Sequence, residues 1–157
     1  MRYAANTNVA VEKSRAEIES TLARFGASAF AYATSNDKAM IKFQAENRII
    51  MFVLNLPARN AEEFTHRTWG GKIRADKVSE SEAFDKWENA CREKWRALAL
   101  LIKAKLVGTQ SGIATFENEF MAHIVMPDGK TVGQHMIPMI EMAYASGKVP
   151  PLVLEFK

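Results

Sequence analysis

Apolar residues recur at spacings of three and four from Glu80 to Val107, the longest helical pattern in the chain. They are Phe84, Trp87, Cys91, Trp95, Leu98, Ile102 and Leu106. Ser79 followed by Glu82 is typical of a capped helix start, and Gly108 of a helix end. The periodicity places the apolar residues on one face of a single helix. We expect this helix to be the scaffold of the fold and its apolar face to lie in the core.

Three runs with strand character precede this helix, at Ala29–Thr34, Ala39–Gln44 and Arg48–Leu54. The third run is apolar nearly throughout, as expected of a strand covered on both faces. Short polar breaks at 35–37 and 46–47 suit hairpin turns. The pattern therefore predicts an antiparallel meander in which Arg48–Leu54 is the most buried strand.

The N-terminal region predicts one shorter helix. Residues 1–13 begin with a polar stretch, and we expect them to be loosely held. Val9 and Val11 alternate with polar or small residues as in a short strand. Ser14 and Glu17 then have the spacing of a capping box, which predicts that the helix begins at Ser14.

The C-terminal region predicts a short strand and a last helix. His123–Met126 reads as the strand, and Thr131 with Gln134 can cap a helix that ends at Gly147. Pro138 falls inside this helix, so we expect a kink or a later start.

These elements predict one α+β domain over residues 1–157. A three-stranded antiparallel meander is packed by one long helix, and flanking N- and C-terminal helices complete the packing. The tail Leu152–Phe156 has the pattern of a strand that adds to a sheet edge.

Neither a helical nor a strand period holds from Asn55 to Val78, which predicts a long basic loop. A connection of this length is usually functional or disordered. Its cations are Arg59, Arg67, Lys72, Arg74 and Lys77, and Trp69, Gly70 and Gly71 lie among them. We interpret the loop as a candidate nucleic-acid site, in which the cations hold phosphates and the indole stacks on an unpaired base. The alternative is a solvated loop whose Trp69 folds back onto the core.

A second candidate site lies on the long helix, where Arg92, Arg96 and Lys103 share one face by their spacing. These three form a candidate basic ridge for phosphate contacts. The alternative is that cations in the C-terminal half of the helix offset its macrodipole.

Composition narrows the class of protein. With 48% hydrophobic and 25% charged residues, the chain falls in the globular range. A net charge of +3 and a pI near 9.0 permit an anionic partner. The single cysteine, Cys91, excludes an internal disulfide and fits a reducing cytoplasm. The chain shows neither a signal core nor an apolar run of about 18 residues, so we expect a cytoplasmic protein without a membrane span.

Signals for catalysis are weak. His66, His123 and His135 lack metal-ligand spacing, and the chain has no P-loop or dinucleotide fingerprint. We therefore predict no catalytic residue, no metal and no cofactor, and expect a protein that is not an enzyme. A small hydrolase is the alternative, and it requires at least two of His66, His123, Asp128 and Glu141 to converge in one pocket.

Several sequence blocks have a familiar pattern. They are Val11–Ile18 with Gly26-Ala27, Ala90–Arg92 with Trp95–Leu98, Ile102–Leu106, Thr115–Glu117, His123–Val125 with Pro127–Gly129, and Gly147-Lys148 with Pro150-Pro151. Together they resemble a family of small bacteriophage and prophage proteins of uncharacterised function. The resemblance covers most of the chain except Asn55–Val78, and it implies a phage or prophage setting in a host cytoplasm. It implies no catalytic residues.

The predicted order of elements is similar to two known topologies. A β-meander followed by a long helix is similar to the core of single-strand annealing proteins. Helix, three strands, helix is also the order in double-stranded-RNA-binding domains, although the Asn55–Val78 segment departs from that pattern. Fold-level similarity of this kind is weak support for function.

The leading hypothesis is a phage-type nucleic-acid-binding protein, which acts on single-stranded DNA in replication or recombination. The alternative is a protein-interaction module that acts on a host or phage protein through the last helix, which contains Met136, Met139 and Met142. We also expect a homo-oligomer.

Overall fold

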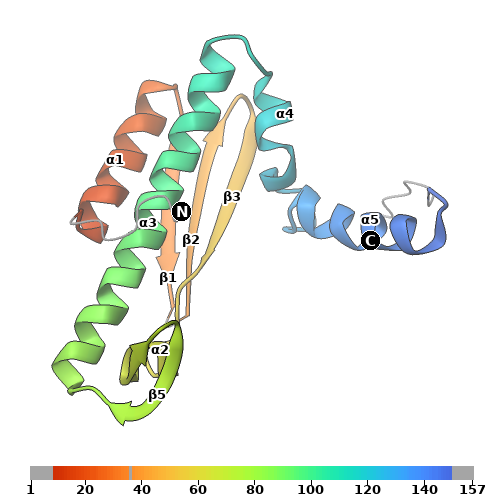
Figure 1. The fold of residues 1–157 in the computed structure, drawn as a ribbon. Helices are drawn as coiled ribbons and strands as arrows, with labels where there is room; N and C mark the ends of the chain where they lie inside the picture. The colour runs from red at the N-terminus through yellow and green to blue at the C-terminus, as the bar shows by residue number, and fades with distance from the viewer. Residues whose placement is uncertain (1–8, 36, 150–157) are drawn as a thin grey trace.

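The structure is a computed structural model that describes residues 9–35 and 37–149 (Figure 1). Its elements are α1 (Val11–Arg24), β1 (Ala29–Thr34), β2 (Lys38–Ala45), β3 (Arg48–Asn55), α2 (Glu62–Thr65), β4 (His66–Trp69), β5 (Lys72–Lys77), α3 (Glu80–Gln110), α4 (Phe116–Phe120), the 3-10 turn η1 (Met121–His123) and α5 (Val132–Ser146).

The first three strands form an antiparallel sheet in the order β1-β2-β3. Glu46 and Asn47 both have positive φ, 48° and 57°, as a tight two-residue hairpin turn requires. The predicted meander and the α+β fold class are confirmed. The prediction that the third strand is the most buried is wrong. β2 is the central strand, and its alternate residues Ala39, Ile41 and Phe43 are almost fully buried.

β3 is less buried than predicted because helices cover only one face of the sheet. Ile50 and Phe52 point into the core, whereas on the other face Ile49 and Val53 are 48% and 53% exposed and only Met51 between them is buried. An apolar run therefore did not mark a strand covered on both faces here.

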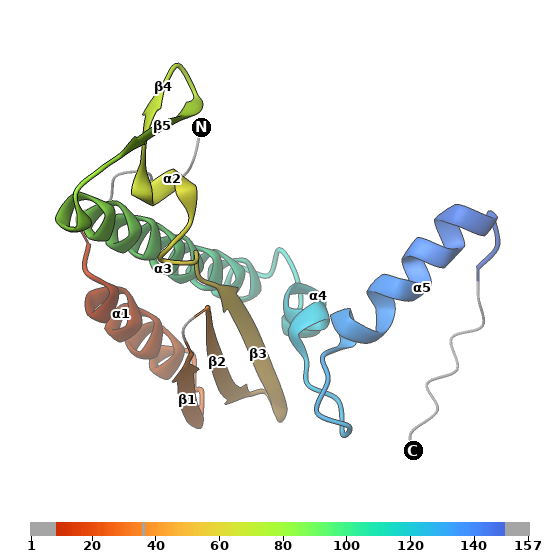
Figure 2. The same ribbon diagram turned by 90° about the horizontal axis from the view of Figure 1, so that it is seen from below.

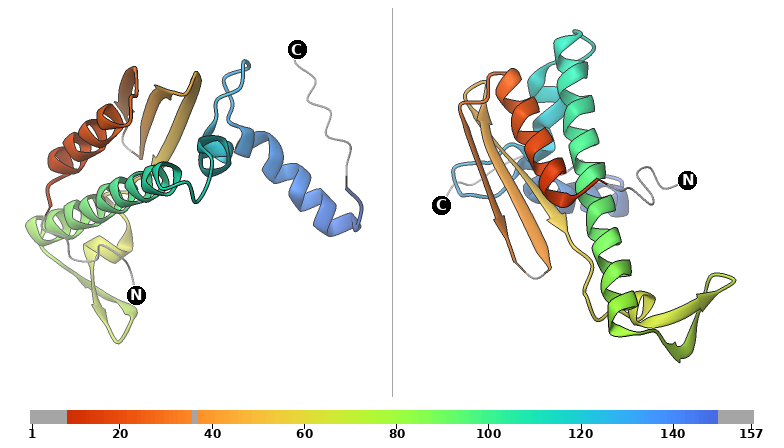
Figure 3. Two further views of the ribbon diagram at one scale, coloured as in Figure 1. Left: turned by 90° about the horizontal axis from the view of Figure 1, so that it is seen from above. Right: turned by 90° about the vertical axis from the view of Figure 1, so that its left-hand side faces the viewer.

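α1 and α3 pack side by side on one face of the sheet (Figures 2 and 3). The core lies between these helices and the sheet. α1 contributes Ile18 and Leu22, and α3 contributes Trp95, Ile102 and Leu106. The predicted role of α3 as the scaffold is thus confirmed.

The start of α3 is as predicted, because the Ser79 hydroxyl accepts a hydrogen bond from the Glu82 amide at 3.2 Å. Its end is three residues later than Val107, because Gly108 stays helical and the helix runs to Gln110. Phe84, predicted to lie in the core, is 38% exposed. The apolar stripe of α3 begins beyond the end of the sheet, so Phe84, its first residue, remains partly in contact with solvent.

The first helix begins at Val11, not at Ser14, so the strand predicted around Val9 and Val11 is wrong. Ala10 is the N-cap and makes no side-chain cap hydrogen bond. Ser14 lies inside the helix and is fully buried against the core. A capping-box spacing within the sequence is therefore not always used as a cap.

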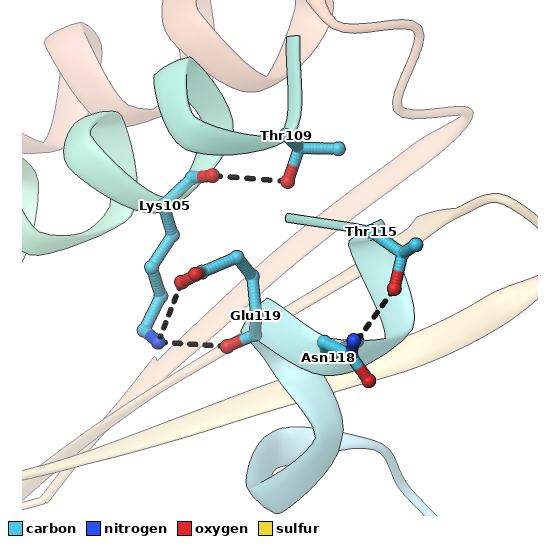
Figure 4. A network of polar contacts seen from close by, with 5 residues as sticks. All are labelled: Lys105, Thr109, Thr115, Asn118 and Glu119. Atoms are coloured by element: carbon cyan, nitrogen blue, oxygen red, sulfur yellow. Dashed lines mark hydrogen bonds and ion pairs between the residues drawn. The ribbon is translucent and has the colours of Figure 1, made fainter. Parts of the chain in front are cut away.

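α4 folds back along the end of α3 and closes the core with Phe120, which contacts Phe43 edge-to-face at 6.0 Å. Lys105 Nζ holds this turn, because it donates to the Glu119 backbone oxygen at 2.7 Å and lies 3.4 Å from its carboxylate (Figure 4). The predicted strand at His123–Met126 does not form. η1 occupies its start, and an isolated bridge joins Ile124 to Ile50 of β3.

The predicted capping box of the last helix is confirmed, since Thr131 and Gln134 exchange both hydrogen bonds. The helix includes Pro138 without a later start and closes at Gly147, whose φ is +66°. It does not complete the packing as expected. α5 projects from the body and packs mainly against η1 (Figure 1). The predicted tail strand Leu152–Phe156 lies outside the described residues.

Candidate nucleic-acid interface

The segment predicted as a long loop is largely structured. It contains the short helix α2 and a hairpin, β4–β5, whose turn is Gly70-Gly71. Both glycines have positive φ, 57° and 76°, the conformation that a two-residue hairpin turn requires. Sequence periodicity failed here because the strands are short and their register shifts between His66 and Thr68.

The hairpin presents an aromatic ring and cations on one face. Trp69 pairs directly with Lys72, so their side chains lie on the same face of the ribbon. Strand alternation places Arg74 on that face as well. Trp69 is 75% exposed. The structure therefore contradicts the alternative in which the indole folds back onto the core.

The hairpin is strongly basic. It carries Arg67, Lys72, Arg74 and Lys77 against a single carboxylate, Asp76, and all of these residues are exposed. Among the described residues, none of the four cations forms an ion pair. Their charges therefore remain available to an anionic ligand.

The hairpin projects from the side of α3 opposite to α1 and the sheet (Figures 2 and 3). Two hydrogen bonds and the burial of one aromatic side chain fix its base. The Val78 amide donates to the Thr65 oxygen at 2.9 Å, Trp87 Nε1 donates to the Pro57 oxygen at 2.9 Å, and Phe64 is buried. The hairpin thus combines an anchored base with an exposed tip.

Arg59 lies at this base. Its guanidinium is 5.0 Å from the Phe84 ring centroid and 5.8 Å from that of Trp87. These cation–π contacts orient the side chain without neutralising it. Arg59 therefore adds positive charge to the base of the hairpin.

A hollow of about 580 Å³ lies between α2 and α3 beside the base. Its lining includes Phe64, Lys94, Glu63 and Glu93. Two carboxylates against one lysine make it a poor phosphate site. We therefore place the candidate interface on the hairpin and not in the hollow.

The predicted basic ridge is a different surface. Arg92 forms an ion pair with Glu88 at 3.3 Å, and Arg96 forms one with Glu17 on α1. Of the three ridge residues, Lys103 alone is exposed. Arg96 thus faces α1, while the hairpin leaves from the other side of α3 (Figure 2). The structure does not bring the ridge and the hairpin cations together.

The residues considered for a hydrolase are not brought into one site by the described structure. Asp128 Oδ2 lies 2.8 Å from His135 Nε2, and His123 stacks on Phe52 with ring centroids 4.0 Å apart. In the part of the chain that is described, no hydrogen bond or ion pair joins any two of the four candidate hydrolase residues. Nor do its His, Cys, Asp and Glu residues form a group of three that could hold a metal ion.

Cys91 is an unpromising nucleophile. Its side chain is buried on α3, and burial, followed by the charge of Glu88, raises the pKa of its thiol. Both effects disfavour the reactive thiolate.

Within the described ranges, no helix is both long and apolar enough to cross a bilayer.

One surface was not predicted from the sequence. The face of the sheet opposite α1 and α3 is not covered by any described helix (Figures 2 and 3). A signal was present, because β1, β2 and β3 contain no Asp or Glu and keep apolar residues on both faces.

Comparison of the chain with protein-family models, curated proteins and solved structures finds no match.

Proposed function

We propose that this protein binds single-stranded nucleic acid through the β4–β5 hairpin, with single-stranded DNA in phage replication or recombination as the ligand. The observation that carries the proposal is the position of Trp69. Its indole is 75% exposed at the hairpin tip and lies beside Lys72. The phage setting rests on the sequence blocks described above.

The exposed indole favours a single strand over a duplex. Bases in a duplex already stack on their neighbours, whereas an unpaired base can stack on an aromatic side chain, at about 1–3 kcal/mol per base. Lys72 and Arg74 on the same face would neutralise the adjacent phosphates. Affinity should therefore depend on both the aromatic ring and the salt concentration.

The test is fluorescence anisotropy with a labelled oligothymidylate over a series of NaCl concentrations. Trp69→Ala should weaken binding by roughly 5- to 150-fold, which corresponds to about 1–3 kcal/mol of lost stacking. The double variant Lys72→Ala/Arg74→Ala should reduce the slope of log K against log salt by about 1.4, or about 0.7 for each phosphate contact.

The control is Lys13→Ala/Arg24→Ala, which removes two exposed cations from α1. It lowers the net charge by the same amount and should leave affinity close to wild type. Absence of binding at low salt, or equal losses in the hairpin and control variants, would contradict the proposal. Unlabelled duplex DNA and duplex RNA should compete poorly, and efficient competition by either would assign a different ligand.

A further inference from the structure

α5 is an apolar helix that packs mainly against η1 within the described part of the chain. Its exposed residues include Ile137, Ile140, Met142 and Tyr144, with exposed fractions from 48% to 89%. Among its 15 residues Glu141 is the only carboxylate, and Lys and Arg are absent. A helix that is apolar around most of its surface is normally buried in a soluble protein. Some other surface should therefore cover α5.

The uncovered face of the sheet is an apolar surface of matching character. By strand alternation it carries three alanines of β1 and, from β2 and β3, Met40, Lys42, Gln44, Ile49, Met51 and Val53. Met51 is buried among its neighbours, while Ile49 and Val53 beside it are exposed. A shallow hollow of about 170 Å³ is lined in part by Ala29, Ala31, Lys42 and Ile49. The alanines leave room for a helix to approach.

The two surfaces fit in charge and in length. The sheet face carries Lys38 and Lys42 without a carboxylate, while α5 carries Glu141 without a cation. The 15 residues of α5 span about 22 Å at ~1.5 Å each. The eight residues of β2 or β3 span about 26 Å at ~3.3 Å each.

α5 is held away from the sheet of its own chain. The capping box of Thr131 and Gln134 fixes its start, and Gly133 packs closely on the Ala122 backbone. From this start α5 points away from the body (Figures 1 and 2). Its exposed residues therefore do not reach the sheet of their own chain without disrupting these contacts.

The area that a stable interface needs favours a reciprocal arrangement. A helix ~22 Å long and ~10 Å wide has a lateral surface of roughly 700 Å², so covering half of it buries about 350 Å² on each side. One α5–α5 contact would then bury about 700 Å² in total, the size of a crystal contact. Two symmetric helix–sheet contacts would bury about 1,400 Å², within the range of stable dimers.

We propose that two copies of this chain form a two-fold symmetric dimer, in which α5 of each copy lies on the open sheet face of the other. This inference does not depend on nucleic-acid binding, because the hairpin and the open sheet face lie on opposite sides of α3 (Figure 2). The dimer would leave both hairpins exposed.

Light scattering coupled to gel filtration tests the stoichiometry. The wild type should have a mass of about 35 kDa, twice the 17.6 kDa of one chain. Ile140→Asp on α5 and Val53→Asp on the sheet face should each shift the mass toward the monomer. Ile113→Asp is the matched control, because Ile113 is 84% exposed between α3 and α4, and it should stay dimeric. A monomeric wild type would overturn the proposal.

Cross-linking tests which surfaces are paired. Because Cys91 is the single cysteine of the chain, one substitution removes all competing thiols. In a Cys91→Ala background, chains with Ile140→Cys are mixed with chains carrying Met40→Cys or Val53→Cys and treated with a short bis-maleimide. Cross-linked heterodimers are expected from the mixtures, and little product from any one variant alone. Cross-linking of the Ile140→Cys chain to itself would indicate α5–α5 pairing and overturn the proposal, as would a dimer without cross-links in either mixture.

Discussion

At the scale of single residues, the burial of His123 makes the stability of the fold depend on pH. Its ring stacks on Phe52. Burial and the nearby charge of Lys105 lower the pKa of the imidazole below its ordinary value of about 6.5. A hydrogen bond with the Met51 backbone raises this pKa but does not outweigh the other two effects. The unfolded chain therefore takes up this proton more readily than the folded chain. Stability should decrease as the pH falls below about 6.5 toward the lower folded-state pKa.

Urea unfolding at about pH 7.5 and about pH 5.5 measures this effect on either side of the ordinary histidine pKa. His123→Gln removes the titrating group and should lose less stability on acidification than the wild type. His66→Gln, which replaces a histidine at the base of the hairpin, controls for the general effect of a His→Gln change. An equal loss in His123→Gln and wild type would contradict the assignment.

The cations of α3 show how far single residues could be interpreted from sequence. The pair of Arg92 with Glu88 follows helical spacing and was open to prediction. The pair of Arg96 with Glu17 joins residues 79 positions apart, so it depends on how α1 packs against α3. The hairpin cations look no different in the sequence, yet they have no carboxylate partner within the described structure. Tertiary contacts, which the sequence pattern does not contain, separate the two groups.

At the scale of elements, the join between η1 and α5 depends on one glycine. A Cβ built on Gly133 would lie 2.8 Å from the Ala122 backbone oxygen, closer than real contacts allow. Gly133→Ala should therefore displace α5 or η1 and destabilise the protein by about 1–3 kcal/mol.

Gly108→Ala is the matched control for this prediction. Gly108 lies inside α3, has no positive φ, and a Cβ there would contact nothing within 4 Å. The same substitution should therefore stabilise the protein by about 0.5–1 kcal/mol, through helix propensity. Urea denaturation of both variants gives the two free energies of unfolding. Effects of the same sign would contradict this account of the join.

Elements with strong local signals were predicted well. The cap of α3 at Ser79, the capping box of α5 and the three-stranded meander all depend on residues close together in sequence. The β4–β5 hairpin was missed, because two short exposed strands with a register shift have no apolar alternation. Its Gly70-Gly71 turn was the signal that could have identified it.

At the scale of the whole molecule, α3 separates two parts of the protein. The sheet, α1 and the core lie on one side of it, and α2 and the hairpin lie on the other (Figure 3). Strand order and the burial of β2 follow from this arrangement, which local patterns could not predict. The residues of the hairpin after His66 are all exposed, so the hairpin contributes little buried apolar surface to stability.

The hairpin should therefore be removable without loss of the fold. The Val78 amide donates to the Thr65 oxygen at 2.9 Å, so replacing His66–Lys77 with two glycines joins this hydrogen-bonded pair by a two-residue turn. The shortened chain should keep its free energy of unfolding within about 1 kcal/mol, because little apolar area is lost. It should keep the dimer mass and lose oligothymidylate binding.

Circular dichroism with urea, light scattering and anisotropy measure the three properties on one sample of the shortened chain. Retained binding would place the nucleic-acid site elsewhere, while loss of the dimer would place the hairpin in the subunit interface. Unfolding would show that the hairpin stabilises α3. The three measurements distinguish these outcomes, because nucleic-acid binding, dimer formation and stability depend on separate surfaces of the molecule.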